Sequence, residues 1–219
     1  VYLNRRAVVV LCADNGVVSE GISQSGSEVT RIVAENLTRR QTSVCRMAGA
    51  ANADVIPVDM GMASRSDNVL LLDRHIADGT RNIAEGPAMT REQAIRAVEI
   101  GIELVGSCRE QGYEIIATGE MGIGNTTPSA AVASLLLGRP PREVTGRGAG
   151  LSDEALERKV RVIEKAVAVN RPDLSDTLDV LAKLGGFDIA GLAGIFIGGA
   201  LHRIPVVIDG LISSVSALA

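Results

Sequence analysis

Residues 6–14, RAVVVLCAD, constrain the fold more than any other stretch of this chain. Residues 7–13 form one unbroken apolar run, which Asp14 closes. A strand with one face in water alternates apolar and polar residues, whereas an unbroken run is typical of a strand buried on both faces of a parallel sheet. Parallel strands need long crossovers between them, usually helices. The sequence therefore predicts an α/β fold.

Strand and helix patterns alternate along the rest of the chain. Further strands are predicted at residues 53–62, 113–118 and 204–210, with a long loop at 63–88. This alternation favours a Rossmann-like open, mainly parallel sheet flanked by helices. Because no linker interrupts the pattern, we expect residues 1–219 to form a single α/β core domain.

Helix starts are marked by capping residues. Ser25–Glu28 and Thr90–Gln93 have capping-box spacing, and the helices behind them are predicted to run to about 39 and 110. The second of these helices places an apolar stripe on one face: Ala94, Val98, Ile102 and Val105.

The remaining helices are predicted from caps and from composition. Thr127 is a favourable N-cap before Pro128, and Gly138 can end that helix. Ser152 or Asp153 caps the next helix. Two more are expected at about 175–184 and at 187–203, the second rich in small residues and therefore able to pack closely against a sheet.

Composition excludes several classes of protein. Aromatic residues make up 2% of the chain, with no tryptophan, so base stacking on aromatic platforms is not available. The net charge is −4 and no basic tract stands out, so no nucleic-acid partner is expected. The uncharged run 189–201 is too short to span a membrane. Three widely spaced cysteines favour a reducing compartment over disulfides or zinc, and we expect a cytoplasmic protein.

The stretch GEMGIGNTTPSAA, residues 119–131, follows a predicted strand and opens a helix. Its glycines allow the backbone to approach a ligand, and the amides of a helix start attract anions. The stretch lacks the lysine of GxxxxGK[ST] and the spacing of GxGxxG. Asn125, Thr126 and Thr127 add side-chain donors, so the loop indicates a site for one monophosphate. The alternative is a plain tight turn before a capped helix.

A second glycine-rich turn, TGRGAG at residues 145–150, also precedes a predicted helix. It is a second candidate anion site, and Lys159, about two turns into that helix, can supply positive charge. The alternative is that Lys159 faces solvent, as most lysines on helices do.

Polar residues close four of the predicted strands. They are Asp14 with Asn15, Asp59, Glu120, and Asp209. Because ligands of open parallel sheets bind beyond the carboxyl ends of the strands, we expect a catalytic cleft there. Each residue alone has turn capping as its alternative. His75 and His202 are not spaced as metal ligands and are interpreted as structural. Acid–base and electrostatic work by carboxylates, without metal or cofactor, is the expected chemistry.

Six stretches of the chain resemble, in order, the nicotinate-nucleotide–dimethylbenzimidazole phosphoribosyltransferase family. They are ADNGVVSEGIS, NIAEGPAMT, GEMGIGNTTPSAA, GRGAGLSDEALERKVRVIEKA, KLGGFDIAGLAGIFIGGA and IPVVIDGLISSVSALA. The resemblance implies transfer of the phosphoribosyl group of nicotinate mononucleotide to 5,6-dimethylbenzimidazole. The products would be α-ribazole 5′-phosphate and nicotinate, in cobalamin biosynthesis. It also implies a homodimer, and no metal, because the leaving group is already a cationic pyridinium.

The resemblance implies roles for individual residues. Glu120 matches an active-site carboxylate beside the base and the ribose, and Ser25 matches a position lining the benzimidazole pocket. Gly148 and Lys159 match the family's second phosphate-binding turn and its lysine. The glycine loop matches the substrate cradle through Met121, Gly122, Gly124, Asn125 and Thr126. Asp209 and Ser213 lie in a segment near the family's site.

Some features depart from the family's pattern. Asn15 stands where the family's AD-x-G segment usually has histidine, and Val33 takes the place of a glutamine near the base. The family's general-base glutamate lies in a later glycine-rich segment that this sequence does not include. We therefore expect a fragment that lacks the enzyme's terminal segments and most of its smaller helical domain. Two alternatives are a non-catalytic module that binds a nucleotide monophosphate, and a scaffold whose glycine loops are structural.

Overall fold

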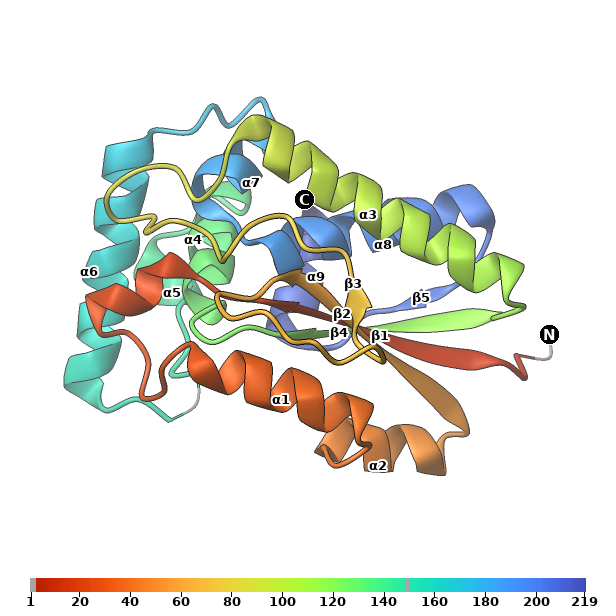
Figure 1. The fold of residues 1–219 in the computed structure, drawn as a ribbon. Helices are drawn as coiled ribbons and strands as arrows, with labels where there is room; N and C mark the ends of the chain where they lie inside the picture. Colours follow the sequence, from red (N-terminus) through yellow and green to blue (C-terminus); the bar gives the residue numbers. More distant parts are fainter. Residues whose placement is uncertain (1–2, 149) are drawn as a thin grey trace.

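Parallel strands form the centre of the molecule in a computed structural model that describes residues 3–148 and 150–219 (Figure 1). The strands are β1 (Arg6–Ala13), β2 (Ala53–Gly61), β3 (Leu72–Asp73), β4 (Ile115–Met121) and β5 (Val206–Val207). Their order is β3-β2-β1-β4-β5, and every pairing is parallel. The predicted α/β fold with an open parallel sheet is confirmed. Residues 1, 2 and 149, which the predicted domain and the second glycine turn include, lie outside the described residues.

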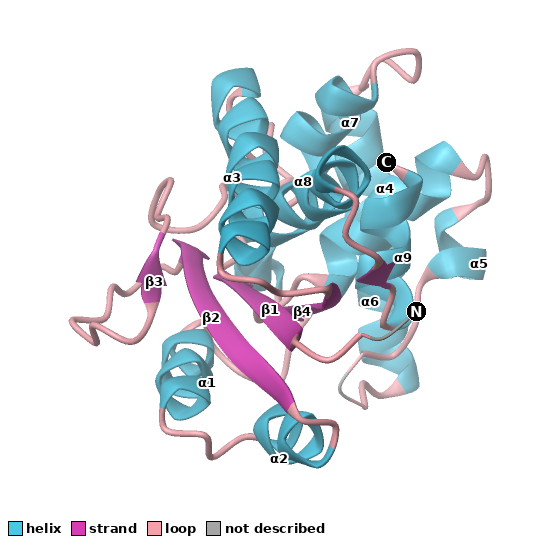
Figure 2. Cartoon of the chain, turned by 90° about the vertical axis from the view of Figure 1, so that its right-hand side faces the viewer, coloured by secondary structure: helices cyan, strands magenta, loops and turns pink. Residues whose placement is uncertain are grey.

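Helices connect and cover the strands. They are α1 (Glu28–Thr38), α2 (Ser43–Ala50), α3 (Arg91–Glu110), α4 (Thr126–Leu136), α5 (Pro141–Val144), α6 (Asp153–Asn170), α7 (Thr177–Leu184), α8 (Phe187–His202) and α9 (Gly210–Leu218), with a 3-10 helix, η1 (Gly16–Glu20). In Figures 1 and 2, α1 and α2 lie on one side of the sheet and α3 and α8 on the other. The sheet is therefore the middle layer of three.

Strand β1 is buried on both faces, as its apolar run predicts. Val9 and Leu11 belong to the larger apolar core, to which α3 and α8 also contribute. Val10 and Cys12 belong to a smaller core with residues of α1 and α2. The side chains alternate with period two, as strand geometry requires, and both sets are apolar because both faces are covered.

The closest helix contact lies between α3 and α8. A Cβ atom on Gly101 would stand 2.1 Å from the carbonyl oxygen of Gly191, so the backbones touch where neither residue has a side chain. A Cβ atom on Gly191 would also stand 2.7 Å from Leu11 of β1. The small residues of α8 therefore let it pack closely, as predicted, and against both a helix and the sheet.

Two predicted helix starts are confirmed. Thr90 and Gln93 form the capping box of α3, with both reciprocal hydrogen bonds present. Ser152 caps α6 by accepting a hydrogen bond from the N–H of Ala155. Gly138 follows the last residues of α4 with φ of +61°, so this helix also ends where the sequence indicates.

Two other predicted helix starts are wrong. The Ser25–Glu28 capping box does not form, because the chain still bends at Ser25, whose N–H donates to Ser23, and α1 begins at Glu28. Thr127 is not the N-cap of α4. Its N–H already donates to the carbonyl of Gly124, so the helical turn starts two residues earlier, with Asn125 at the N-cap position.

Several elements differ from the predicted pattern in length or number. Strand β4 runs past residue 118 to Met121, because residues 119–121 continue the pairing with β1. Strand β5 is only two residues long. The short elements α2, β3 and α5 were not predicted. On α3 the buried face centres on Ala97, Ile100, Gly101 and Leu104, whereas Val98 and Ile102 are only half-buried.

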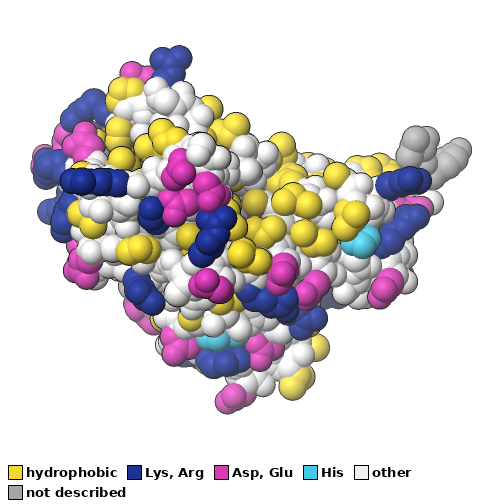
Figure 3. All heavy atoms as spheres, turned by 90° about the horizontal axis from the view of Figure 1, so that it is seen from above, with side chains coloured by type: hydrophobic (Ala, Val, Ile, Leu, Met, Phe, Trp, Pro, Cys, Tyr) yellow, Lys and Arg dark blue, Asp and Glu magenta, His cyan; other side chains and the backbone are white. Residues whose placement is uncertain are grey.

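The face of the molecule on the α3 side is chemically mixed. Seen from the α3 side, acidic, basic and apolar side chains are interspersed (Figure 3). Within residues 3–148 and 150–219, no helix is long and apolar enough to cross a membrane. The same residues contain no group of three or more His, Cys, Asp or Glu side chains placed to hold a metal ion.

Candidate functional site

A cavity of about 240 Å³ lies at the carboxyl end of β4. It joins the loop after η1, the glycine loop between β4 and α4, the second glycine turn, and α6. The lining residues are Ile22, Ser23, Gln24, Glu120, Met121, Gly122, Ile123, Gly124, Asn125, Thr126, Arg147, Gly148, Leu151 and Lys159. The two glycine-rich turns that the sequence singles out therefore face one cavity, although they lie well apart along the chain.

Lys159 is the buried cation of this cavity. Only 1% of the residue is exposed, and its Nζ donates to Thr126 Oγ1 at 2.6 Å and to the carbonyl of Gly146 at 3.4 Å. No carboxylate of the described residues lies within ion-pair distance of it. Burial lowers the pKa of Lys159 to about 8. The solvent-facing interpretation of Lys159 is wrong, and the side chain is placed to receive an anion.

Gly148 keeps the space beside this ammonium open. Its φ of +56° is a left-handed conformation that side chains disfavour, and a Cβ atom there would stand 3.3 Å from Thr126 Oγ1 and 3.7 Å from Lys159 Nζ. Arg147, the preceding residue, adds a second positive charge at the rim. It donates to the carbonyl of Leu151 at 2.8 Å and forms an ion pair with Asp153.

The glycine loop brings the start of α4 to the same cavity. A Cβ atom on Gly122 would stand 2.3 Å from the carbonyl oxygen of Ala13, so the loop lies directly on β1 at this point. The N–H of Asn125 then donates to the carbonyl of Gly122 at 3.1 Å, and α4 begins at Thr126. The positive end of the helix dipole therefore lies beside Lys159, which adds to the attraction for an anion.

A carboxamide between two carboxylates forms the other side of the site. Asn125 Nδ2 donates to Glu120 Oε2 and also to Asp188 Oδ2, the latter at 2.8 Å. Burial raises the pKa of Glu120, which the negative charge of Asp209 raises further, while the bond from Asn125 lowers it. Burial also raises the pKa of Asp188 to about 7, and the charge of Glu120 adds to this.

The other strand-end carboxylates do not line the cavity. Asp59 accepts from the N–H groups of Gly61 and Met62, each at 2.9 Å, and Asp14 accepts from the N–H of Ala63 at 2.8 Å. Both side chains therefore hold the backbone after β2, which is the turn-capping alternative. Burial raises the pKa of Asp14.

His75 and Asn15 are also held within the fold. His75 stands between two carboxylates, with Nδ1 at 3.0 Å from Asp59 and Nε2 at 3.0 Å from Asp78. This arrangement fits the structural interpretation of the residue. Asn15, which occupies the histidine position of the family's pattern, is buried, and its Nδ2 donates to the carbonyl of Ile123 at 3.4 Å.

The last predicted site residues lie around the cavity in different settings. Ser25 is exposed. It directly follows residues 22–24, which line the cavity, and is not itself among the lining residues. Asp209 is exposed at the N-cap position of α9, near enough for its charge to act on Glu120. Ser213 is buried, where its hydroxyl accepts from the N–H of Asp209 at 3.2 Å and contacts the hydroxyl of Thr118.

Sequence reasoning missed two charged residues, one in the lining of the cavity and one beside it. Asp188 is fully buried at the start of α8, in a stretch whose small and apolar residues indicate only close packing. An acidic residue inside so apolar a run is the signal that could have found it, because such a residue is rarely buried without a partner. Arg147 lies within the second glycine-rich turn, which was interpreted as an anion site from its glycines and from Lys159, without Arg147.

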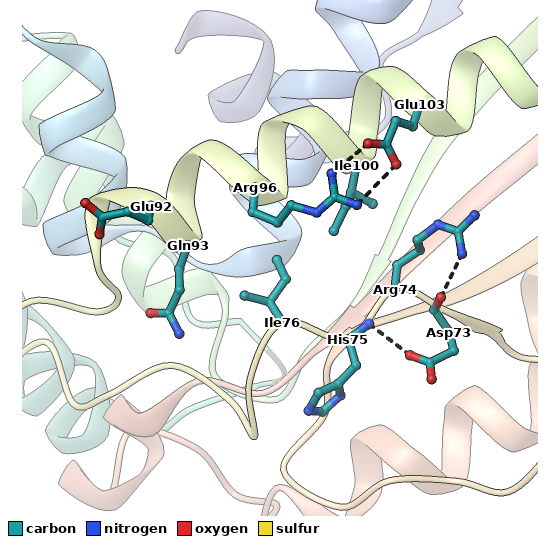
Figure 4. A pocket seen from close by; sticks show the side chains of 9 residues that line it. All are labelled: Asp73, Arg74, His75, Ile76, Glu92, Gln93, Arg96, Ile100 and Glu103. Atoms are coloured by element: carbon teal, nitrogen blue, oxygen red, sulfur yellow. Dashed lines mark hydrogen bonds and ion pairs between the residues drawn. The ribbon is translucent and has the colours of Figure 1, made fainter.

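A wider groove of about 600 Å³ lies between α3 and the segment after β3 (Figure 4). One of its two arginines, Arg96, has a carboxylate partner. Arg96 bridges to Glu103 at 2.6 Å, and Arg74 donates to the carbonyl of Asp73 at 2.9 Å. The smaller cavity differs from this groove in that its lysine is buried and has no carboxylate partner among the described residues.

A protein-family model described as "Phosphoribosyltransferase" matches residues 1–219. Relatives in Acetivibrio thermocellus and Desulforudis audaxviator are each 49% identical to this chain over 217 residues, which is 99% of its length. Both are named nicotinate-nucleotide–dimethylbenzimidazole phosphoribosyltransferase. The chain spans 62% of the length of each of these relatives.

Solved structures show the same fold. The crystal structure of CobT from Thermus thermophilus matches 99% of this chain with a TM-score of 0.94 and 41% identity, and the match covers 65% of that chain. A second structure from the same organism, described as the nicotinate-nucleotide–dimethylbenzimidazole phosphoribosyltransferase, matches with a TM-score of 0.91 and 40% identity. At 41% and 40% identity, the two structures are similar to this chain in sequence as well as in fold.

Proposed function

This chain belongs to the phosphoribosyltransferase family of these relatives, and on that premise we propose that its protein transfers the phosphoribosyl group of nicotinate mononucleotide to 5,6-dimethylbenzimidazole. The products are α-ribazole 5′-phosphate and nicotinate, and the reaction serves cobalamin biosynthesis. The observation that carries the proposal is the buried ammonium of Lys159. It has no carboxylate partner among the described residues and shares one cavity with Glu120.

The cavity suits a mononucleotide because its two sides differ in charge. Lys159, Arg147 and the start of α4 make one side positive, where the single phosphate binds. Glu120 and Asn125 form the other side, which suits the ribose. The phosphate then anchors the substrate, and its binding free energy positions the sugar for reaction.

Electrostatic stabilisation is the role of Glu120 in this proposal. As the pyridinium leaves, positive charge develops on the ribose, and a carboxylate beside the ring stabilises that charge. Because burial raises the pKa of Glu120, the ionised form is costly in the empty site and is favoured when a cationic substrate arrives. We assign removal of the benzimidazole proton to the general-base glutamate implied by the family resemblance, which this sequence does not include.

Release of nicotinate by the full-length gene product tests this proposal. We expect release from the mononucleotide only when dimethylbenzimidazole is present. Lys159→Met should abolish it, whereas Lys165→Met, an exposed position on the same helix, should not. Release without the base would indicate a hydrolase. No release, with the mononucleotide still raising the melting temperature, would indicate a non-catalytic nucleotide-binding module.

We further propose that the protein acts as a homodimer in the cytoplasm. The family resemblance supports the dimer, and the buried, unpaired Cys12, Cys45 and Cys108 support a reducing compartment. Light scattering coupled to size-exclusion chromatography should give twice the mass of one chain for the full-length protein. A monomer at micromolar concentration would contradict the dimer.

A further inference from the structure

Asn125 is held by two carboxylates from different parts of the chain. Glu120 lies at the end of β4, and Asp188 lies in the first turn of α8, far along the sequence. Both accept from the same nitrogen, Nδ2 of Asn125. An NH2 group has two hydrogens, so each carboxylate takes one of them and the amide has no further hydrogen to donate.

The backbone is shaped around the carboxylate of Asp188. Its Oδ1 accepts from the N–H of Ile189 at 3.0 Å, which fixes the side chain in the first turn of α8. Two glycines leave room for it. A Cβ atom on Gly186 would stand 2.5 Å from Oδ1, and one on Gly122 would stand 3.2 Å from Oδ2.

Stability does not account for this arrangement. Asp188 is fully buried, and the described residues place no cation within ion-pair distance of it. A buried carboxylate with hydrogen bonds but no countercharge is expensive, and a well-packed apolar residue is usually the more stable choice. The carboxylate is therefore more consistent with a role in the adjacent cavity than with a role in packing.

We propose that Asp188 is a positioning residue for the transfer reaction, which fixes the carboxamide of Asn125 and through it the carboxylate of Glu120. This inference rests on the proposed function. With Nδ2 turned toward Asp188, the amide of Asn125 keeps one orientation and holds Oε2 of Glu120. Oε1 of Glu120, which has no hydrogen bond to the described residues, is then left for the ribose. Asp188 does not line the cavity, and its hydrogen bond toward the site is the one from Asn125.

A double-mutant cycle on the full-length gene product tests this role. Asp188→Asn keeps the size of the side chain and removes its charge. We expect it to lower kcat about 10- to 100-fold, as loss of an outer-shell partner does at metal sites, while KM for the mononucleotide changes less than about threefold. In an Asn125→Ala background it should have no further effect, because the residue it acts through is absent. Asp67→Asn, at an exposed position, is the matched control and should leave kcat unchanged.

Additivity decides the outcome. If Asp188→Asn lowers kcat by the same factor with and without Asn125, Asp188 does not act through Asn125 and the inference is wrong. An unchanged kcat in Asp188→Asn also overturns it. If the wild-type enzyme forms no product, the proposed function fails, and the catalytic part of this inference fails with it. An active wild type with additive variants overturns the inference alone.

A second measurement does not depend on turnover. In the NMR spectrum of the wild-type protein, we expect both Nδ2 protons of Asn125 to exchange slowly with solvent, because each is held by a carboxylate. Disappearance of a signal pair in Asn125→Ala assigns it. Exchange with solvent as fast as that of a surface asparagine would show that the carboxylates do not hold the amide and would refute the positioning role.

Discussion

Replacing Lys159 with methionine is expected to stabilise the ligand-free protein. Methionine fills a similar space without a charge. Burial lowers the pKa of Lys159 from its ordinary 10.5 to about 8. Since one pH unit corresponds to about 1.4 kcal/mol, burying the ammonium costs about 3 kcal/mol near pH 7. Loss of the hydrogen bond to Thr126 offsets about 1 kcal/mol, so the free energy of unfolding should rise by about 2 kcal/mol.

The pH dependence of stability gives an independent check on this magnitude. In the unfolded chain, Lys159 keeps its proton up to about pH 10.5, whereas in the folded protein it keeps it only up to about pH 8. Between these values the unfolded state binds more protons, so the free energy of unfolding of the wild type rises with pH. The penalty is fully present below pH 8 and is gone above pH 10.5. Lys159→Met should lack this rise.

Urea unfolding at about pH 7 and about pH 9.5 measures both effects. Circular dichroism is the suitable probe, since the chain has no tryptophan. Lys165→Met, on the same helix with 53% of its side chain exposed, is the control and should change stability by less than about 0.5 kcal/mol. A Lys159→Met protein that is less stable than the wild type at the lower pH, and that keeps the wild-type rise toward the higher pH, would refute the reasoning.

Three further predictions follow from named contacts. Gly148→Ala should weaken mononucleotide binding at least about tenfold in calorimetry, because a methyl group there crowds Thr126 and Lys159. Gly146→Ala, which has open space around it, is the control and should bind the mononucleotide nearly as the wild type does. Equal affinities of the two variants would contradict this prediction. Gly101→Ala should lower the free energy of unfolding by about 2 kcal/mol or more, because the added methyl group separates α3 from α8. Gly49→Ala, on the open face of α2, is the neutral control. An unchanged melting curve for Gly101→Ala would be evidence against the close packing of the two helices. At about pH 8, binding of the mononucleotide should take up roughly half a proton, because the phosphate raises the pKa of Lys159. Calorimetric titrations in two buffers of different ionisation enthalpy measure this uptake, and equal binding enthalpies in the two buffers would contradict it.

The elements with the strongest local pattern could be predicted from the sequence. The unbroken apolar run of β1 requires cover on both faces, and the core residues on its two sides confirm this. Short elements could not be predicted, because β3, with two residues, and α5, with four, are too short to show a periodicity. Helix starts at Ser25 and Thr127 were wrong for a related reason. A favourable capping residue marks where a helix can begin, and the bend of the preceding loop decides where it does.

The glycine loops of the site were visible in the sequence, and so were Glu120 and Lys159 as candidate charged residues, but the directions of the charged side chains were not. Lys159 lies on a helix with a clear apolar face, and the sequence does not show that the second glycine turn covers its ammonium. Asp14 and Asp59 end their strands as the sequence indicates, yet both turn toward backbone N–H groups. The direction of a strand-end carboxylate depends on the loops beside it. Asp188 reaches the site only because α8 packs across the sheet, which no local pattern shows.

Analysis of the product formed by the full-length gene product tests the central proposal most directly. The protein is incubated with nicotinate mononucleotide and dimethylbenzimidazole, and the product is identified by mass and by the NMR signal of its anomeric proton. The proposed transfer predicts α-ribazole 5′-phosphate, formed only when both substrates are present and lost in Lys159→Met. Ribose 5-phosphate alone, or unchanged mononucleotide, would contradict the proposal that this cavity carries out phosphoribosyl transfer.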